Sequence, residues 1–210
     1  YANSLRCWFG LAIIIFLFIN FNSIFISNGF YDTDAARLVI NSYGWSNSDA
    51  VPTGIYTTKV SPMYMFLIKS YFDLKLFNAN KLPLLLGVCS NFFSALNLCL
   101  FFYLISKLFN EKIALISCIL YVTSYSFIES AIILISHVEA MFFLLLSAIC
   151  FYQYLLKNKQ IFIFLTFLSA IVSVSFKANI ILCFGLFWAI LILTDKFKIK
   201  YILLTVLIGI

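Results

Sequence analysis

Long uncharged runs alternate with short polar connections along most of the chain. The first run, Cys7 to Ile26, holds about 20 residues without a charge, the length that an α-helix needs to cross a bilayer. It is longer than the apolar core of a secretory signal, and no small-residue cleavage site follows it, so we expect a retained membrane helix. Further spans are expected at about Leu82–Ile105, Ile113–Ile128, Ile132–Leu156, Ile161–Phe176 and Ala178–Leu193, with another that begins near Tyr201.

The composition agrees with this pattern. Hydrophobic residues make up 64% of the chain and the mean hydropathy is +1.06, whereas soluble domains contain roughly 45–50% apolar residues. The predicted fold is therefore all-α, a polytopic transmembrane helical bundle of about seven spans. Residues 1–210 are expected to form a single transmembrane domain. The last predicted span runs to Ile210, so we expect the chain to be a fragment of a longer protein.

Basic residues predict the orientation of the bundle. Arg6 precedes the first span, and the connections 107–112, 157–159 and 196–200 carry seven lysines on alternate turns. Cytoplasmic loops are enriched in Lys and Arg, so the amino terminus is predicted inside and the long loop of about 27–81 outside. The same rule accounts for the net charge of +6, which we therefore do not attribute to nucleic-acid binding. The predicted location is a bacterial inner membrane, a plasma membrane or the endoplasmic reticulum.

Two helix-start signals lie in the outer loop. Asp32 or Thr33 can cap a helix over about 35–43, in which Ala36, Ile40 and Tyr43 recur at helical spacing. Ser61-Pro62 places a capping side chain before a proline at the first helical position. The helix that follows, to about Phe77, carries Lys69 and Asp73 one turn apart and is predicted to lie along the membrane interface.

The paired acids Asp32 and Asp34 are the first candidates for chemistry. A carboxylate there could act as a general base or orient an acceptor hydroxyl, and two together could hold a divalent cation. The structural alternative is a helix cap with a solvated neighbour. No metal-ligand spacing occurs among the six cysteines, all of which fall in apolar runs and are expected to be free thiols.

Three basic residues are candidates for phosphate binding. Arg37 offers a bidentate fork, and Lys59 is a second cation in the same loop. Their alternatives are lipid-headgroup contacts or, for Arg37, an ion pair with Asp34 one helical turn away. Lys177 lies at the edge of a span, where an ammonium is costly unless it is paired or bound to phosphate, although it could also snorkel.

Helix rise predicts where the remaining charges lie. Glu139 precedes Lys157 by 18 residues, and Lys177 follows Lys159 by the same separation, so each should be roughly 27 Å from the cytoplasmic border. Glu129 follows Lys112 by 17 residues and should reach a similar level. The prediction is therefore that these charges, with His137 beside Glu139, gather at the outer rim near Asp32 and Asp34. Glu139 could alternatively form a structural ion pair with Lys177, and His137 could be a satisfied interfacial residue.

The order of these motifs resembles the C-type integral-membrane glycosyltransferases, in particular the protein O-mannosyltransferase and aminoarabinose-transferase branch. The segments that carry the likeness are Asp32-Thr33-Asp34 with the helix Ala35–Tyr43, Lys59-Val60-Ser61-Pro62-Met63-Tyr64, Leu108-Phe109-Asn110-Glu111-Lys112-Ile113-Ala114, Ser136-His137-Val138-Glu139 and Ser175-Phe176-Lys177. They cover most of the chain, which would be the amino-terminal half of such an enzyme. Where the branch commonly has Asp-Glu this chain has Asp-x-Asp, and a double proline is only Ser-Pro.

The resemblance implies transfer of a sugar from a polyprenyl- or dolichyl-phosphate carrier to a protein, lipid or glycan acceptor at the outer membrane face. In that reaction Asp34, with Asp32 as the alternative, would activate the acceptor hydroxyl. Arg37, Lys59 and Lys177 would hold the leaving phosphate, with Glu139 and His137 beside them. A divalent cation is left open. The competing interpretations are a transporter or lipid flippase, or a non-catalytic membrane subunit whose loop is a docking surface.

Overall fold

The computed structural model describes residues 2–25, 62–73, 82–125, 127–128, 137–177 and 189–190. Within these ranges the chain forms helices joined by short turns and contains no β-strand. The helices are α1 (Ala2–Phe25), α3 (Pro62–Asp73), α4 (Leu82–Leu108), α5 (Glu111–Val122), α7 (His137–Lys157) and α8 (Gln160–Phe176). The all-helical fold class is therefore confirmed for the part of the chain that the structure describes.

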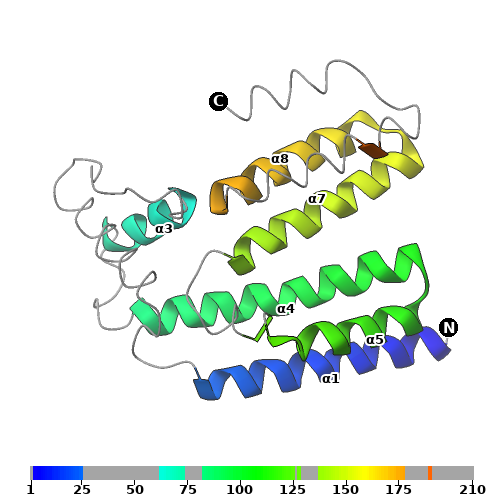
Figure 1. The fold of residues 1–210 in the computed structure, drawn as a ribbon, viewed down its shortest axis with the longest axis horizontal. Coiled ribbons are helices and arrows are strands. Elements are labelled where there is room, and N and C mark those ends of the chain that lie inside the picture. Colours follow the sequence, from blue (N-terminus) through cyan, green and yellow to red (C-terminus); the bar gives the residue numbers. More distant parts are fainter. Residues whose placement is uncertain are drawn as a thin grey trace.

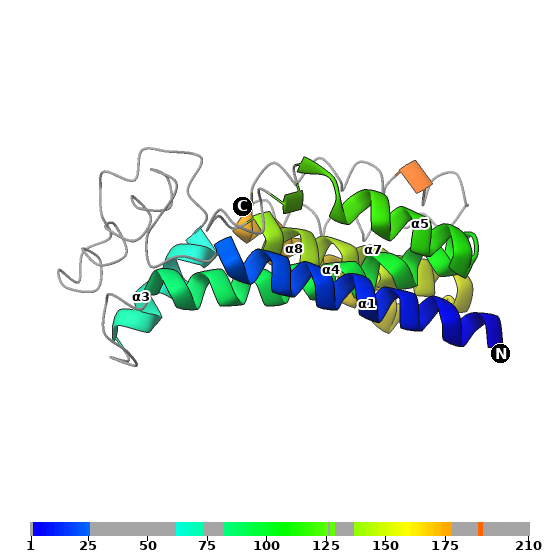
Figure 2. The ribbon, with the colours of Figure 1, turned by 90° about the horizontal axis from the view of Figure 1, so that it is seen from below.

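The long helices lie side by side in an elongated bundle (Figures 1 and 2). α4 is central, because it contacts α1, α5 and α7, and α8 packs along the whole of α7. The beginning of α1, the end of α4, the beginning of α5, the end of α7 and the beginning of α8 meet at one end of the bundle (right in Figure 1). We call this the lysine-rich end, because Arg6, Lys107, Lys112, Lys157 and Lys159 lie there. α3 lies at the opposite end, which we call the α3 end.

Three of the helices are long and apolar enough to cross a membrane: α1, α4 and α7. α8 is apolar but shorter, at 17 residues. These four helices coincide with four of the predicted spans, which is compatible with a membrane protein. Of the other predicted spans, 178–193 (apart from 189–190) and the span that begins near Tyr201 lie outside the described residues, as does most of the predicted outer loop.

Buried side chains hold the bundle together in separate clusters. Phe151 and Tyr154 of α7 pack against Ile163 and Phe167 of α8. A second cluster joins α1, α4 and α5 and contains Cys7, Leu11, Phe102, Ala114 and Cys118. A third lies at the α3 end and contains Ile68, Tyr71, Leu82, Ala140 and Phe176, from α3, α4, α7 and α8. The third cluster fixes α3 against the helix ends that carry the candidate residues.

The helix α5 ends earlier than the sequence predicts. Apolar residues continue to Ile128, but Val122 is the last residue of the helix and Thr123 is its carboxyl-terminal cap. The Thr123 hydroxyl donates to the Ile119 carbonyl oxygen at 2.9 Å, and the Ser124 hydroxyl donates to the Tyr121 carbonyl oxygen at 2.7 Å. Hydroxyls that bond to preceding carbonyls compete with the helical ladder. The predicted span over Ile113–Ile128 is therefore not one uninterrupted helix: it breaks at Thr123 and Ser124, and Tyr125, Phe127 and Ile128 are helical again.

Short connections at the lysine-rich end use residues suited to tight turns. The Asn110 side chain caps α5 by accepting a hydrogen bond from the Ile113 amide at 2.9 Å. Asn158, between α7 and α8, has a φ of 52°, a left-handed conformation that Asn adopts more readily than most residues. Each of these short connections keeps the two helices that it joins adjacent. As a result, α7 and α8 lie side by side and run in opposite directions.

Candidate functional site

His137 and Lys177 meet at the α3 end of the bundle. His137 is the first residue of α7 and Lys177 follows the last residue of α8, so the antiparallel pairing brings them together across 40 positions. Lys177 Nζ is hydrogen-bonded to His137 Nε2, and both side chains are half-buried. Burial also lowers the pKa of the Lys177 ammonium.

Packing on either side of this contact fixes its position. The Phe143 and Phe176 rings stack with centroids 5.8 Å apart and an interplanar angle of 10°. The Ser173 hydroxyl donates to the Ala140 carbonyl oxygen at 2.6 Å, which ties the last turn of α8 to the first turn of α7. The Lys177 backbone amide donates to the Ser173 carbonyl oxygen, so the same turn also orients Lys177. The Lys177 ammonium is therefore held in place by two packed helices, α7 and α8.

Glu139 points to a different neighbour. Its side chain is only 3% exposed and lies against α4, where Ser90 is next to the carboxyl group. One carboxylate oxygen, Oε2, has no hydrogen-bond partner. No ion pair joins Glu139 to Lys177, whose side chain contacts His137 instead. The alternative of a structural Glu139–Lys177 ion pair is therefore wrong.

The inner face of α4 carries polar residues that the sequence analysis overlooked. Ser90, Asn91, Ser94 and Asn97 are all buried, between 0% and 6% exposed, and they recur at helical spacing. The Asn97 amide group donates to the Val138 carbonyl oxygen at 2.9 Å, which joins this face to the first turn of α7. The Asn91 amide group donates to the Ile19 carbonyl oxygen of α1 at 3.4 Å. The signal was present in the sequence, since these positions interrupt an apolar run every three or four residues.

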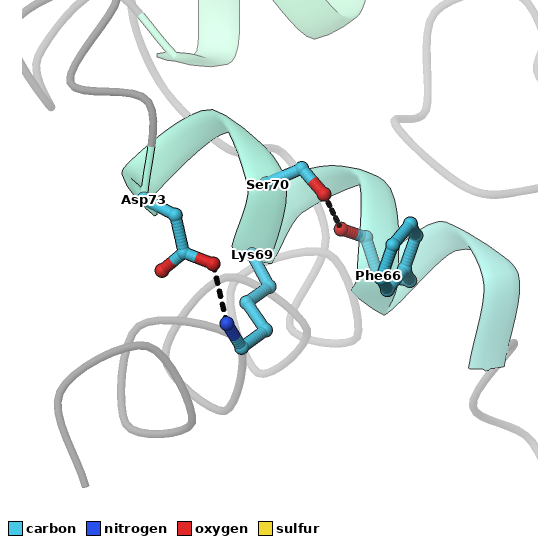
Figure 3. A network of polar contacts seen from close by, with 4 residues as sticks. All are labelled: Phe66, Lys69, Ser70 and Asp73. Atoms are coloured by element: carbon cyan, nitrogen blue, oxygen red, sulfur yellow. Dashed lines mark hydrogen bonds and ion pairs between the residues drawn. The ribbon is translucent and has the colours of Figure 1, made fainter. Parts of the chain in front are cut away.

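α3 completes this end of the bundle. It begins at Pro62, as predicted, and its Lys69 and Asp73 side chains form an ion pair one turn apart (Figure 3). The Ser70 hydroxyl donates to the Phe66 carbonyl oxygen at 2.8 Å. Ile68 is 1% exposed and packs into the cluster with Ala140 and Phe176. One face of α3 is thus buried against the helices that carry His137 and Lys177, and the other carries the ion pair.

Several predicted site residues lie outside the described residues: Asp32, Asp34, Arg37, Lys59 and Glu129. Among the residues that the structure does describe, no group of three or more His, Cys, Asp or Glu side chains could hold a metal ion. A divalent-cation site at Asp32 and Asp34 stays a prediction. Of the predicted binding residues, the structure brings His137 and Lys177 into contact and turns Glu139 towards α4.

Comparisons with known proteins add no relative: no protein-family model, curated protein or solved structure matches this chain.

Proposed function

We propose that the protein is a membrane glycosyltransferase that moves a sugar from a polyprenyl- or dolichyl-phosphate carrier to a protein, lipid or glycan acceptor at the non-cytoplasmic face. The observation that carries the proposal is the half-buried Lys177, held against His137 at the end of the bundle opposite the lysine-rich connections. If those connections are cytoplasmic, as the positive-inside rule expects, Lys177 faces the other side of the membrane.

The chemistry of this cation fits a phosphate leaving group. Sugar transfer from a lipid phosphate leaves negative charge on the phosphate, and a fixed cation stabilises that charge as it develops. A partly desolvated ammonium is more effective than one in water, because the local dielectric constant is lower. His137 beside it adds a second hydrogen-bonding group that could reach a phosphate oxygen. α8 and α7 hold both groups in place before the donor binds.

We assign activation of the acceptor hydroxyl to one of the two predicted acids, Asp34 or Asp32. α1 ends at Phe25, at the same end of the bundle as His137 and Lys177. Asp34 follows Phe25 by nine residues, a length of chain that spans at most about 30 Å. Either Asp34 or Asp32 is therefore within reach of the α3 end, where a carboxylate would take the proton of the attacking hydroxyl.

The experiment that tests the proposal uses membranes containing the full-length protein and a panel of radiolabelled lipid-phosphate sugars. We expect transfer of one sugar to an endogenous or added acceptor, with activity abolished in Asp34→Asn or Asp32→Asn while insertion and abundance stay normal. Full activity in both single variants and in the double variant would contradict the catalytic assignment. No transfer from any donor in the panel would contradict the glycosyltransferase itself.

A transporter is the second candidate, because an acid within a membrane helix commonly marks an ion or substrate pathway. Glu139 is such an acid, and it faces the polar side of α4. Uptake of a labelled solute into proteoliposomes, without chemical change to any lipid-phosphate sugar, is the result that would favour this function over transfer.

A further inference from the structure

The lysine-rich end collects basic side chains from all the helices that begin or end there (Figure 1). Its five cations, Arg6, Lys107, Lys112, Lys157 and Lys159, are all exposed. Among the residues that the structure describes at this end, the only carboxylate is that of Glu111, which accepts a hydrogen bond from the Ser4 hydroxyl. Positive charge is therefore in clear excess on this surface.

Side-chain contacts join the helix ends into one surface. The Ser4 hydroxyl donates to Glu111 Oε1 at 2.8 Å, which ties the first turn of α1 to the first turn of α5. The Tyr152 hydroxyl donates to the Lys107 carbonyl oxygen at 3.2 Å, which ties the end of α4 to the end of α7. The short connection through Asn110 holds α4 and α5 together. The cations of neighbouring helices thus share one surface, and a planar partner needs no single point at which they converge.

Two of the lysines are held close to their helix ends by aromatic rings. Lys107 Nζ is 5.6 Å from the centroid of the Tyr103 ring, and Lys157 Nζ is 5.5 Å from the centroid of the Phe162 ring. A ring faces one side of an ammonium, which has three N–H donors and so keeps others for an anion. These contacts restrict the two side chains before any partner binds, which reduces the ordering cost of binding.

Exposed apolar side chains alternate with these cations. Leu108 and Phe109, which follow Lys107, are 50% and 66% exposed, and Leu156, which precedes Lys157, is 63% exposed. The border of a bilayer offers phosphate groups and acyl chains within a few ångströms of each other, so it accommodates both kinds of side chain. A soluble acidic partner would satisfy the lysines and leave the apolar groups in water. The mixture therefore favours a lipid surface.

We propose that the lysine-rich end binds the headgroups of acidic phospholipids in the leaflet that it faces. A leaflet with acidic lipids has a negative surface potential, and each lysine close to it adds to the attraction. The positive-inside rule requires only that the separate loops be basic. The assembly of these loops into one surface of the folded bundle is a further property, which sugar transfer does not require. Its test does not depend on that activity.

The test measures which lipids contact the purified full-length protein in nanodiscs of phosphatidylcholine. Trace spin-labelled phosphatidylglycerol or phosphatidylcholine is included, and the fraction of label immobilised at the protein gives the relative affinity of the two lipids. We expect phosphatidylglycerol to be preferred by roughly fivefold or more, the factor for one lysine near an anionic headgroup. The preference should fall sharply at a salt concentration of about 1 M, where the screening length is about 3 Å. Equal affinities at low salt would overturn the proposal.

Matched lysine-to-glutamine variants connect the preference to this surface. Replacing all four lysines of the lysine-rich end should reduce the ratio of the two affinities to about one. Lys69→Gln makes the same chemical change at the α3 end, where Lys69 is paired with Asp73, and should keep the wild-type ratio. If the fourfold variant does not fold, Lys112→Gln and Lys157→Gln give the same test singly, because both lysines are exposed. Each should lower the ratio below that of Lys69→Gln.

Three other results would overturn the proposal. If the folded fourfold variant, or both single variants, kept the wild-type ratio, acidic lipids would bind elsewhere. If inorganic phosphate removed the preference when chloride at equal ionic strength did not, the surface would bind free phosphate. If polyglutamate bound the wild type in nanodiscs through these lysines and phosphatidylglycerol showed no preference, the partner would be an acidic protein segment.

Discussion

The two ends of the bundle carry charge in opposite ways. At the lysine-rich end Lys107, Lys157 and Lys159 are exposed. Lys107 lies over the Tyr103 ring of α4, and Lys157 lies over the Phe162 ring of α8. At the α3 end Glu139 is 3% exposed, and His137 and Lys177 are half-buried. Exposed charges cost little and need no particular partner, whereas buried ones are costly unless something stabilises the charge. The first end carries charges that need no particular partner, and the second carries charges that require a partner or a ligand.

The largest effect should come from removing one cation at each end. Lys177→Ala should reduce sugar transfer by about 10²–10³-fold, the cost of losing one group that stabilises developing charge. Lys157→Ala is the matched control, an exposed lysine at the end of α7, and should leave transfer unchanged. The measurement is turnover of the lipid-phosphate sugar in membranes with equal amounts of protein. Equal activity in the two variants would remove the distinction between the ends.

The contribution of a phenylalanine side chain to stability should also be larger at the α3 end than at the lysine-rich end. Phe176 is 3% exposed and stacks on Phe143, so Phe176→Ala should destabilise the fold by about 3 kcal/mol. Phe109, in the connection after α4, is 66% exposed, and Phe109→Ala should change stability by less than about 0.5 kcal/mol. Thermal unfolding in detergent compares them. A similar loss for both would mean that the α3 end is not held by its buried cluster.

The pH dependence of stability should also depend on Lys177. Burial disfavours its ammonium form, so the folded state binds fewer protons than the unfolded state as the pH approaches the usual lysine value of 10.5. The free energy of unfolding should therefore rise with pH from the lowered pKa of Lys177 up to 10.5. Unfolding temperatures measured across that range should show a shallower rise in Lys177→Met than in the wild type. Lys157→Met should keep the wild-type slope.

The smallest effect is expected on the exposed face of α3. The ion pair between Lys69 and Asp73 joins positions one helical turn apart, and such pairs contribute about 0.3–0.5 kcal/mol. Lys69→Gln, Asp73→Asn and the double variant form a cycle that isolates the pair. A coupling energy several times larger would show that this face of α3 is less exposed to solvent in the membrane than it is in the structure.

Sequence patterns predicted features that depend on local chemistry. Ser61-Pro62 predicted the beginning of α3, and the helix that follows places Lys69 and Asp73 one turn apart, where they form an ion pair. The end of α5 was missed because Thr123 and Ser124 were counted within an apolar run, although their hydroxyls bond to preceding carbonyls. Counting residues from the lysines gives the height of a side chain along a helix and not the direction in which it points. His137 and Glu139 are two residues apart and so diverge by about 200° around α7, which directs one to Lys177 and the other to α4.

The sequence contains the polar positions of α4 but does not show what they contact. Ser and Asn are common within apolar helices, and they can satisfy themselves against their own backbone. The contacts of these side chains depend on how α4 packs against α7. Asn97 bonds to Val138, and Ser90 meets Glu139, only after the two helices have packed. The outer rim predicted from Asp32 and Asp34 stays a prediction, since both lie outside the described residues.

The early end of α5 has a consequence for the lipid around it. Twelve residues rise about 18 Å, well short of a hydrocarbon layer about 30 Å thick. The chain continues past the turn at Thr123 and Ser124, because Tyr125, Phe127 and Ile128 are helical again and the Phe127 and Ile128 amides both donate to the Ser124 carbonyl oxygen. Backbone polar groups do not tolerate bare hydrocarbon. At this interruption the Thr123 and Ser124 amides donate to the Ile119 and Tyr121 carbonyl oxygens, so the break keeps its own backbone paired and is compatible with an apolar environment.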